Sequence, residues 1–340
     1  MGRFKEIDIV KGLAMLTVLW HHSFILYPVN INALPWCQHA ISINLTFFMN
    51  VFFLVSGYLF AFSRNQGFLQ NMRGKAKRLL VPYLSFSAVT LGMKLLAPAL
   101  VNKKVESIGA FFDDLLLRGG ELWFVYVLFL IFVIWPWVLK RMSGTAVWLT
   151  VFALIVTDFF VPSGLAGDLL MYKNVLHYSI FFVAGYGLKC VGREWLKSTP
   201  FFAVVTLLFL ACCCIWVKHL QAYPALQYLQ AMIGCAFVWM FAYRLSNAER
   251  EVTPRLNRFL TFVGRYSLPF YWFNGFVLVV ARTLVAKVLP AQSSVAIALS
   301  IFLLCVAIET GVVLLVRKIP KVGMFVGIPS RSVKPALAKA

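Results

Sequence analysis

The chain has 340 residues, of which 61% are hydrophobic and 13% are charged, and its formal net charge at pH 7 is +20. A soluble domain averages about 45–50% apolar and about 25% charged residues, so this composition excludes an ordinary soluble domain. The mean hydropathy of +0.83 instead predicts a polytopic membrane protein. Charged residues from Arg3 to Asp8 lead directly into the first apolar segment, and no small-residue cleavage site follows it. We therefore expect the first segment to remain as an anchor rather than to be removed as a signal peptide.

Ten segments are long and apolar enough to span a bilayer, and they predict an all-α fold with about ten transmembrane helices. The segments lie near 8–28, 41–62, 80–97, 121–139, 145–161, 175–191, 200–217, 226–244, 264–285 and 294–316. No linker or soluble appendage interrupts them, so residues 1–340 are predicted to form a single membrane-embedded domain with a short basic tail at about 318–340. The longest outer loop, at about 98–120, contains Asp113 and Asp114, and we expect a short surface helix there.

The basic residues are distributed unevenly over the loops. If the amino terminus is cytoplasmic, 23 of the 32 lysines and arginines fall on the inner side. Seven fall on the outer side and two lie within spans: Lys103, Lys104, Arg118, Lys173, Lys218, Arg282 and Lys287, and then Lys11 and Lys94. By the positive-inside rule, this bias predicts ten helices with both termini cytoplasmic. The positive charge is thus explained by topology and by contacts with anionic lipid or a polyphosphate ligand, and we expect no nucleic acid partner.

The seven cysteines show no paired metal-ligand spacing, and most fall inside apolar runs. Cys37 and His39 could offer two ligands, which are too few for a metal site, so none is predicted.

Ionisable side chains share one stripe of the first apolar segment. An α-helix turns about 100° per residue, so His22 returns to within roughly 20° of Lys11, at a rise of about 16 Å. Asp8 lies about 40° from His22 on the same wheel, whereas His21 faces another surface. Ionisable groups in a span usually face the protein interior or a wet cavity. His22 could serve as a general base while Asp8 and Lys11 orient a ligand. The alternative is that Lys11 snorkels to the inner surface and His22 makes a structural hydrogen bond.

Two inner regions offer further binding candidates. Ser56 and Gly57 are small residues that allow helices to approach closely, or that could line a substrate channel. The basic loop at 73–78 precedes Pro82 and contains Lys75 and Arg78. Its charge is an orientation signal, and it would equally suit the phosphates of a nucleotide approaching from the cytoplasm.

Further candidates lie in the fourth, ninth and tenth spans. Trp123 and Tyr126 are predicted at the outer mouth of the fourth span, where aromatic residues ordinarily form an interfacial belt, and neighbouring Glu121 could help to shape an acceptor site. The ninth span contains two more binding candidates, Tyr271 and Asn274, and the amide could equally join two helices. The tenth span contains a carboxylate of unknown role, Glu309. No Walker loop, GxSxG, GxGxxG or HExxH motif is present, which disfavours soluble cofactor-binding chemistry.

Five short motifs in order resemble the integral-membrane acyltransferase family 3. They lie at 8–23, 53–58, 77–83, 122–124 and 267–271, and the resemblance extends over essentially the whole chain. Within the family, the sequence looks closest to the polysaccharide-modifying, fucose O-acetylase-like branch. The family's first-span motif, a basic residue and then the catalytic histidine, falls here on Lys11 and His22. The family usually has arginine at the first position, so Lys11 keeps the charge without the bidentate fork. The ninth-span motif often ends in histidine, where this chain has Asn274.

The resemblance implies a multi-pass protein of the bacterial inner membrane that transfers an acyl group, usually acetyl, from cytoplasmic acyl-CoA. The implied acceptor is a sugar hydroxyl of a surface polysaccharide or a lipid-linked glycan. Acyl-CoA is then a co-substrate and no cofactor is permanently bound. His22 supplies the base, and the basic inner loop holds the CoA phosphates.

Other classes of membrane protein would also place charges in spans. A transporter or flippase for a lipid-linked sugar or small anion is the main alternative, but no convincing internal repeat is present. A glycan polymerase generally has a large outer loop that this chain lacks. A purely structural subunit does not explain Lys11, His22 and Glu309 within spans.

Overall fold

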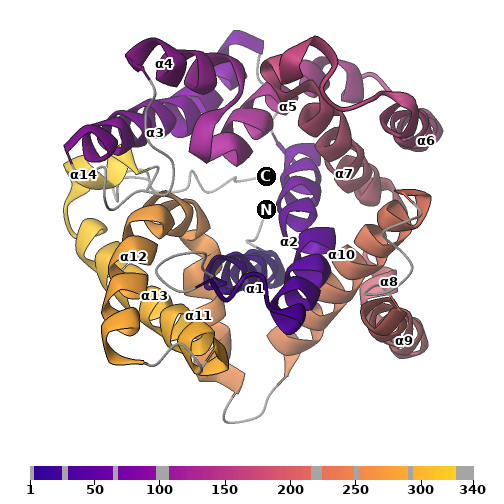
Figure 1. The fold of residues 1–340 in the computed structure, drawn as a ribbon. Coiled ribbons are helices and arrows are strands. Elements are labelled where there is room, and N and C mark those ends of the chain that lie inside the picture. The colour runs from indigo at the N-terminus through magenta and orange to yellow at the C-terminus, as the bar shows by residue number, and fades with distance from the viewer. Residues whose placement is uncertain are drawn as a thin grey trace. The chain divides into compact units, whose positions relative to one another are not determined.

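The computed structural model describes residues 4–24, 30–63, 68–96, 107–215, 224–248, 253–289 and 294–326, and these contain helices and no strand (Figure 1). In chain order the elements are α1 (Lys5–His22), α2 (Pro35–Ala61), α3 (Phe68–Leu96), α4 (Ile108–Leu117), η2 (Gly120–Leu122), α5 (Trp123–Leu139), α6 (Gly144–Phe160), η3 (Leu165–Met171), α7 (Tyr172–Val191), α8 (Glu194–Lys197), α9 (Thr199–Ile215), α10 (Pro224–Asn247), α11 (Thr253–Arg265), α12 (Ser267–Val288), α13 (Ser294–Val316) and α14 (Pro320–Phe325).

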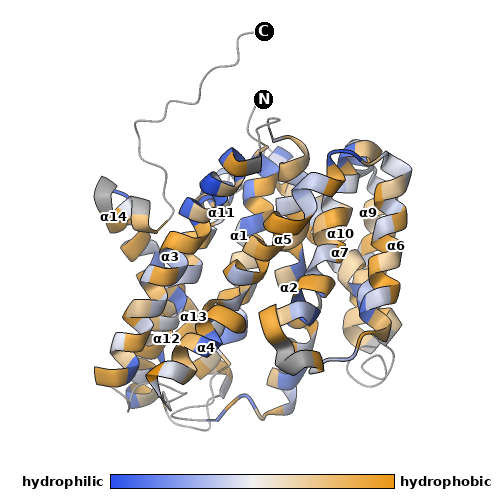
Figure 2. Ribbon diagram, turned by 90° about the horizontal axis from the view of Figure 1, so that it is seen from above, coloured by the Kyte–Doolittle hydropathy of each residue, from blue (hydrophilic) through white to orange (hydrophobic). Residues whose placement is uncertain are grey.

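Each of the ten predicted apolar segments overlaps one of these helices, so the all-α prediction is confirmed. Six helical stretches are long and apolar enough to cross a membrane: Pro35–Ala61, Leu69–Leu96, Ile108–Leu139, Ala225–Asn247, Ser267–Val288 and Ser294–Val316. Two further apolar helices, α6 and α9, are shorter. Figure 2 colours much of α3, α12 and α13 as hydrophobic. The chain is thus a membrane protein, while the count of ten spans and the cytoplasmic termini stay predictions.

Several predicted boundaries were wrong. The basic segment at 73–78, predicted as a loop, lies inside α3, because 68–81 contains no proline and its Lys, Arg and Leu residues favour a helix strongly enough to accommodate Gly74. The described part of the first helix ends at His22, which therefore lies in its last turn; predicted residues 25–28 fall outside the described residues. Arg282, counted with the outer loops, is buried within α12. The helix expected around Asp113 is α4.

The described helices form two compact units, and the first consists of Met1–Met49, Leu196–Ala222 and Leu229–Ala340. In it, α1 and α11 cross at very short distance. A Cβ atom on Gly12 would collide with the backbone carbonyl of Leu260, and one on Gly264 would collide with that of Asp8. Small residues at both positions are therefore what allows the two backbones to touch.

The second unit consists of Asn50–Trp195 and Tyr223–Tyr228. In it, α2 and α7 cross in the same manner. A Cβ atom on Gly57 would meet the backbone of Phe182, and one on Gly185 would meet that of Leu54. The packing role considered for the Ser56–Gly57 pair thus holds for Gly57, while Ser56 beside it is half-buried.

Candidate active site

The predicted stripe on α1 is built by an uninterrupted helix from Lys5 to His22. Lys11 Nζ lies 3.0 Å from Asp8 Oδ1, and the two side chains are 22% and 6% exposed. Residues three apart lie on the same face of a helix, so the pair follows directly from the sequence spacing. Because Asp8 is almost fully buried, it fixes the position of the Lys11 ammonium group while leaving part of it accessible.

The two neighbouring histidines at the end of α1 have different surroundings. The His22 side chain is exposed. His21 is half-buried, its ring stacks on Phe48 with 5.3 Å between ring centroids, and its buried Nδ1 has no hydrogen-bond partner among the described residues. The two imidazoles contact each other edge to face at 5.4 Å. The His22 side chain is therefore the more exposed of the two, whereas the His21 ring packs against Phe48.

The sequence interpretation missed α11, which it treated as part of an inner loop. Its buried residues Leu260 and Val263 face α1, and Asn257 donates from Nδ2 to the Leu245 carbonyl at 2.6 Å. Its arginines are exposed: Arg255, Arg258 and Arg265. Apolar residues spaced three and four apart in 256–263 were the signal that could have revealed this amphipathic helix. The exposed arginines of α11 therefore form a basic surface on the helix that packs against α1, which carries Lys11.

The polar residues of α12 and α13 meet inside the first unit. Asn274 Nδ2 donates to Glu309 Oε1 at 3.1 Å, and both side chains are buried. Glu309 thus has a hydrogen-bond partner that the amino-acid sequence did not reveal, and the Asn274 amide joins α12 to α13. Tyr271 is half-buried, and its ring contacts that of Trp272 at 5.6 Å.

In the second unit, the two basic candidates lie on α3. Lys75 is half-buried, with its Nζ 3.8 Å from the centre of the Phe132 ring, and Arg78 is exposed. The face of an aromatic ring attracts a cation electrostatically, so the Phe132 ring helps to hold the Lys75 ammonium group in place.

The aromatic candidates at the start of α5 are held in different ways. Tyr126 donates from its hydroxyl to the Leu116 carbonyl at 2.8 Å, which fixes the end of α4. Trp123 stacks on Tyr178 of α7, with 5.5 Å between ring centroids. Glu121, considered for an acceptor site, forms an ion pair with Lys94 at 2.6 Å. The Tyr126 hydroxyl is thus engaged by a backbone carbonyl, whereas Trp123 is held through the stacking of its ring.

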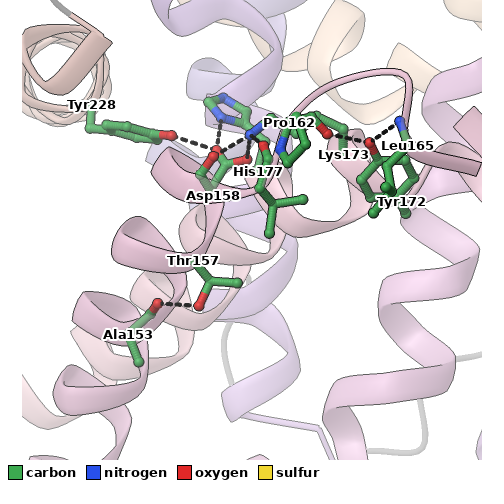
Figure 3. Close-up of polar contacts among 10 residues, drawn as sticks. Ala153, Thr157, Asp158, Pro162, Leu165, Tyr172, Lys173, His177 and Tyr228 are labelled. Carbon is green, nitrogen blue, oxygen red and sulfur yellow. Dashed lines mark hydrogen bonds and ion pairs between the residues drawn. The ribbon is translucent and has the colours of Figure 1, made fainter.

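A cluster of ionisable groups that the sequence interpretation did not single out surrounds Asp158 of α6 (Figure 3). Its carboxylate accepts hydrogen bonds at Oδ2 from His177 Nδ1 at 2.9 Å and from the Tyr228 hydroxyl at 2.6 Å. Lys173 Nζ lies 2.8 Å from Oδ1. The signal was present, because Asp158 and His177 are ionisable residues within predicted spans.

The candidate residues predicted from the sequence fall into two sets, each within one unit. Asp8, Lys11, His22, Tyr271 and Asn274 belong to the first unit. Ser56, Lys75, Arg78, Trp123 and Tyr126 belong to the second. Within these sets the structure pairs Asp8 with Lys11, and it joins Asn274 to Glu309. No group of three His, Cys, Asp or Glu side chains suited to a metal occurs among the described residues.

The structure is thus that of an all-α membrane protein whose first helix carries an exposed histidine and an ion-paired lysine. Comparison with protein families gives a match to the acyltransferase domain over residues 4–311. The chain therefore belongs to acyltransferase family 3, as its motifs had indicated. Searches of curated proteins and of solved structures found no match.

Proposed function

We propose that this membrane acyltransferase moves an acetyl group from cytoplasmic acetyl-CoA to a sugar hydroxyl of a surface polysaccharide or lipid-linked glycan. The observation that carries the proposal is the exposed His22 at the end of α1, eleven residues after a Lys11 that is paired with buried Asp8. A base and an anion-binding cation on one helix stripe are two of the groups that acyl transfer from a CoA thioester requires.

In the proposed step, the sugar hydroxyl oxygen attacks the thioester carbonyl carbon while His22 takes the hydroxyl proton. The new C–O bond forms, the C–S bond of the tetrahedral intermediate breaks, and CoA leaves as the thiol after receiving the proton from His22. Imidazole suits this exchange because it both accepts and donates a proton near neutral pH. No external oxidant, reductant or permanently bound cofactor is needed.

The donor carries phosphate groups, and the basic side chains supply complementary charge. Lys11 is proposed to contact the donor, and Lys75 and Arg78 to bind the CoA phosphates. The exposed arginines of α11 add positive charge to the unit that contains Lys11. With anionic lipids around it, the protein is proposed to reside as a multi-pass protein in a bacterial inner membrane.

Family membership also bears on the alternative of a transporter or flippase. A match over residues 4–311 makes the chain an acyltransferase, so the charges of α1 are better explained by group transfer than by transport. The O-acetyl specificity and the fucose O-acetylase-like branch remain part of the proposal.

The proposal predicts that His22→Ala abolishes transfer. Membranes from cells that express the chain are incubated with radiolabelled acetyl-CoA, and alkali-labile label is counted in the glycan and glycolipid fractions. Removing a general base lowers a rate by about 100-fold to 10,000-fold, so the variant should fall to background. His21→Phe is the matched control, because it keeps a ring stacked on Phe48, and it should retain activity.

Both variants are checked for equal amounts in the membrane by immunoblot. Full transfer by His22→Ala would overturn the assignment of the base. Wild-type membranes that place no alkali-labile label in any sugar fraction would overturn the O-acetyl acceptor class.

A further inference from the structure

Asp158 of α6 lies at the centre of a cluster formed with Lys173, His177 and Tyr228. Three side chains from two other segments converge on one carboxylate that is 2% exposed. Lys173 also donates to the carbonyl of Val161 at 2.8 Å, so its ammonium group closes the end of α6. An ionised carboxylate in a predicted span is costly unless it is paired, and here three donors pair it.

The chain that leads into this cluster is strained. Leu170 and Met171 have φ values of +56° and +49°, although neither is glycine, and they directly precede the first residue of α7. Two successive non-glycine residues in the left-handed region persist only where the surroundings hold them. They lead directly into α7, the helix that carries both Lys173 and His177.

His177 is the member of the cluster that can act on a ligand. Its Nδ1 is taken by Asp158, which leaves Nε2 as the second functional atom of a side chain that is 33% exposed. An exposed imidazole in a span is expected to face a wet cavity rather than lipid. A carboxylate behind Nδ1 fixes the ring and its tautomer, as in other oriented histidines.

Aromatic rings lie directly beside this imidazole. The ring of Tyr178 meets that of His177 edge to face, with 5.0 Å between ring centroids, and it stacks with that of Trp123 at 5.5 Å. Phe53 completes the stack at 4.3 Å from Tyr178. The C–H face of a pyranose is apolar and its rim is polar, so it is matched by aromatic rings next to a hydrogen-bonding group.

We propose that His177, held by Asp158 and next to the ring stack of Phe53, Tyr178 and Trp123, forms a subsite that binds a neutral pyranose of the acceptor through one of its hydroxyls. The inference rests on the proposed function, since it assigns a sugar to that reaction. The bound sugar need not be the residue that is acylated, because the acceptor is a glycan of several residues.

A neutral ligand fits better than an anion because the cluster is internally balanced. Lys173 and Asp158 form an ion pair and neutralise each other. The Lys173 ammonium is already shared between Asp158 and the Val161 carbonyl, so it has little left to offer a phosphate or carboxylate. Hydroxyls, which both donate and accept, suit a free imidazole nitrogen.

The test uses His177→Asn in the purified full-length chain, because the asparagine amide reproduces the Nδ1 donor to Asp158 and removes Nε2. The acceptor probe is the glycolipid fraction extracted from the membranes in which transfer is detected. We expect the KM for this fraction to rise about tenfold, the effect of losing one hydrogen bond, while the KM for acetyl-CoA is unchanged. Thr157→Val, on the exposed residue next to Asp158, is the matched control and should keep both values.

A purely structural cluster predicts the opposite pattern. His177→Asn would then keep the wild-type KM for the glycolipid fraction, and His177→Gln, which loses the Nδ1 donor, would lower the melting temperature. That result overturns the subsite. Absence of transfer by the wild-type chain would instead overturn the proposed function, so the two failures are distinguishable. Trp123→Leu provides an independent test of the subsite, because it should raise the KM for the acceptor and leave the KM for acetyl-CoA unchanged.

Discussion

At the scale of single residues, the ion pair on α1 links stability to donor binding. Asp8 is buried and Lys11 is its partner in the described structure, so the carboxylate is tolerated in the helix because the ammonium offsets its charge. Removing one partner of a largely buried pair leaves an uncompensated charge, whereas removing both does not. The loss of stability on substituting Asp8 or Lys11 therefore depends on whether the other member of the pair is still charged.

Lys11→Met is expected to destabilise the protein by about 2 kcal/mol and to raise the KM for acetyl-CoA about tenfold, because it removes the ammonium group paired with buried Asp8 and a donor contact. Adding Asp8→Asn should restore most of the stability but not the KM. Lys11→Arg keeps the charge and adds a bidentate fork, so its KM should equal or fall below that of the wild type. Thermal unfolding in detergent and steady-state kinetics measure the two effects. Equal KM values for Lys11→Met and the wild type would exclude a donor contact.

At the scale of helices, two glycine-lined crossings position the candidate side chains. Gly12 and Gly264 bring α1 against α11, and Gly57 and Gly185 bring α2 against α7. Without a hydrophobic driving force between helices in lipid, close backbone contact supplies much of the association. The first crossing fixes the helix that carries Lys11 and His22, and the second fixes the helix that carries His177.

Gly264→Ala should weaken the protein, because the added Cβ meets the backbone of Asp8 and Gly12 rather than a flexible side chain. Overpacking of this kind costs about 1–3 kcal/mol and should also lower the transfer rate, since α1 must shift. Gly275→Ala makes the same chemical change on α12, where a Cβ would have no atom within 4 Å, and should be tolerated. Melting temperatures and transfer rates of both variants are compared. Equal destabilisation by the two would show that the crossing is not responsible.

At the scale of the whole molecule, the distribution of positive charge predicts topology. Lys140 and Arg141 lie between α5 and α6, while the segment after α6 contains no basic residue before Lys173. Cytoplasmic loops are enriched in lysine and arginine, so the first of these connections should be inside and the second outside.

Reporter fusions test this topology. Alkaline phosphatase, which is active only outside the cytoplasm, should be inactive when fused after Met142 and active when fused after Ser163. Green fluorescent protein at the same positions should give the reciprocal pattern, which controls for expression. High phosphatase activity at Met142 would reverse the predicted orientation of the chain.

The sequence by itself determined what depends on composition and on local spacing. Long apolar runs have to be helices in a bilayer, because every backbone polar group must be satisfied internally, and so all ten segments overlap helices. The Asp8–Lys11 pair followed from a separation of three residues. The family was visible from short motifs, since these are read along the chain.

Only the tertiary structure decided which distant polar groups meet. Asp158 and Tyr228 are 70 residues apart, and Asn274 and Glu309 are 35 apart, so no helical wheel relates them. It also separated His22 from His21 by exposure, and it revealed α11 as a helix packed on α1. The physical reason is that the spacing of apolar residues determines only which face of a helix is buried. The partner of a buried polar group is selected by which helices approach closely, and local spacing along the chain does not encode that choice.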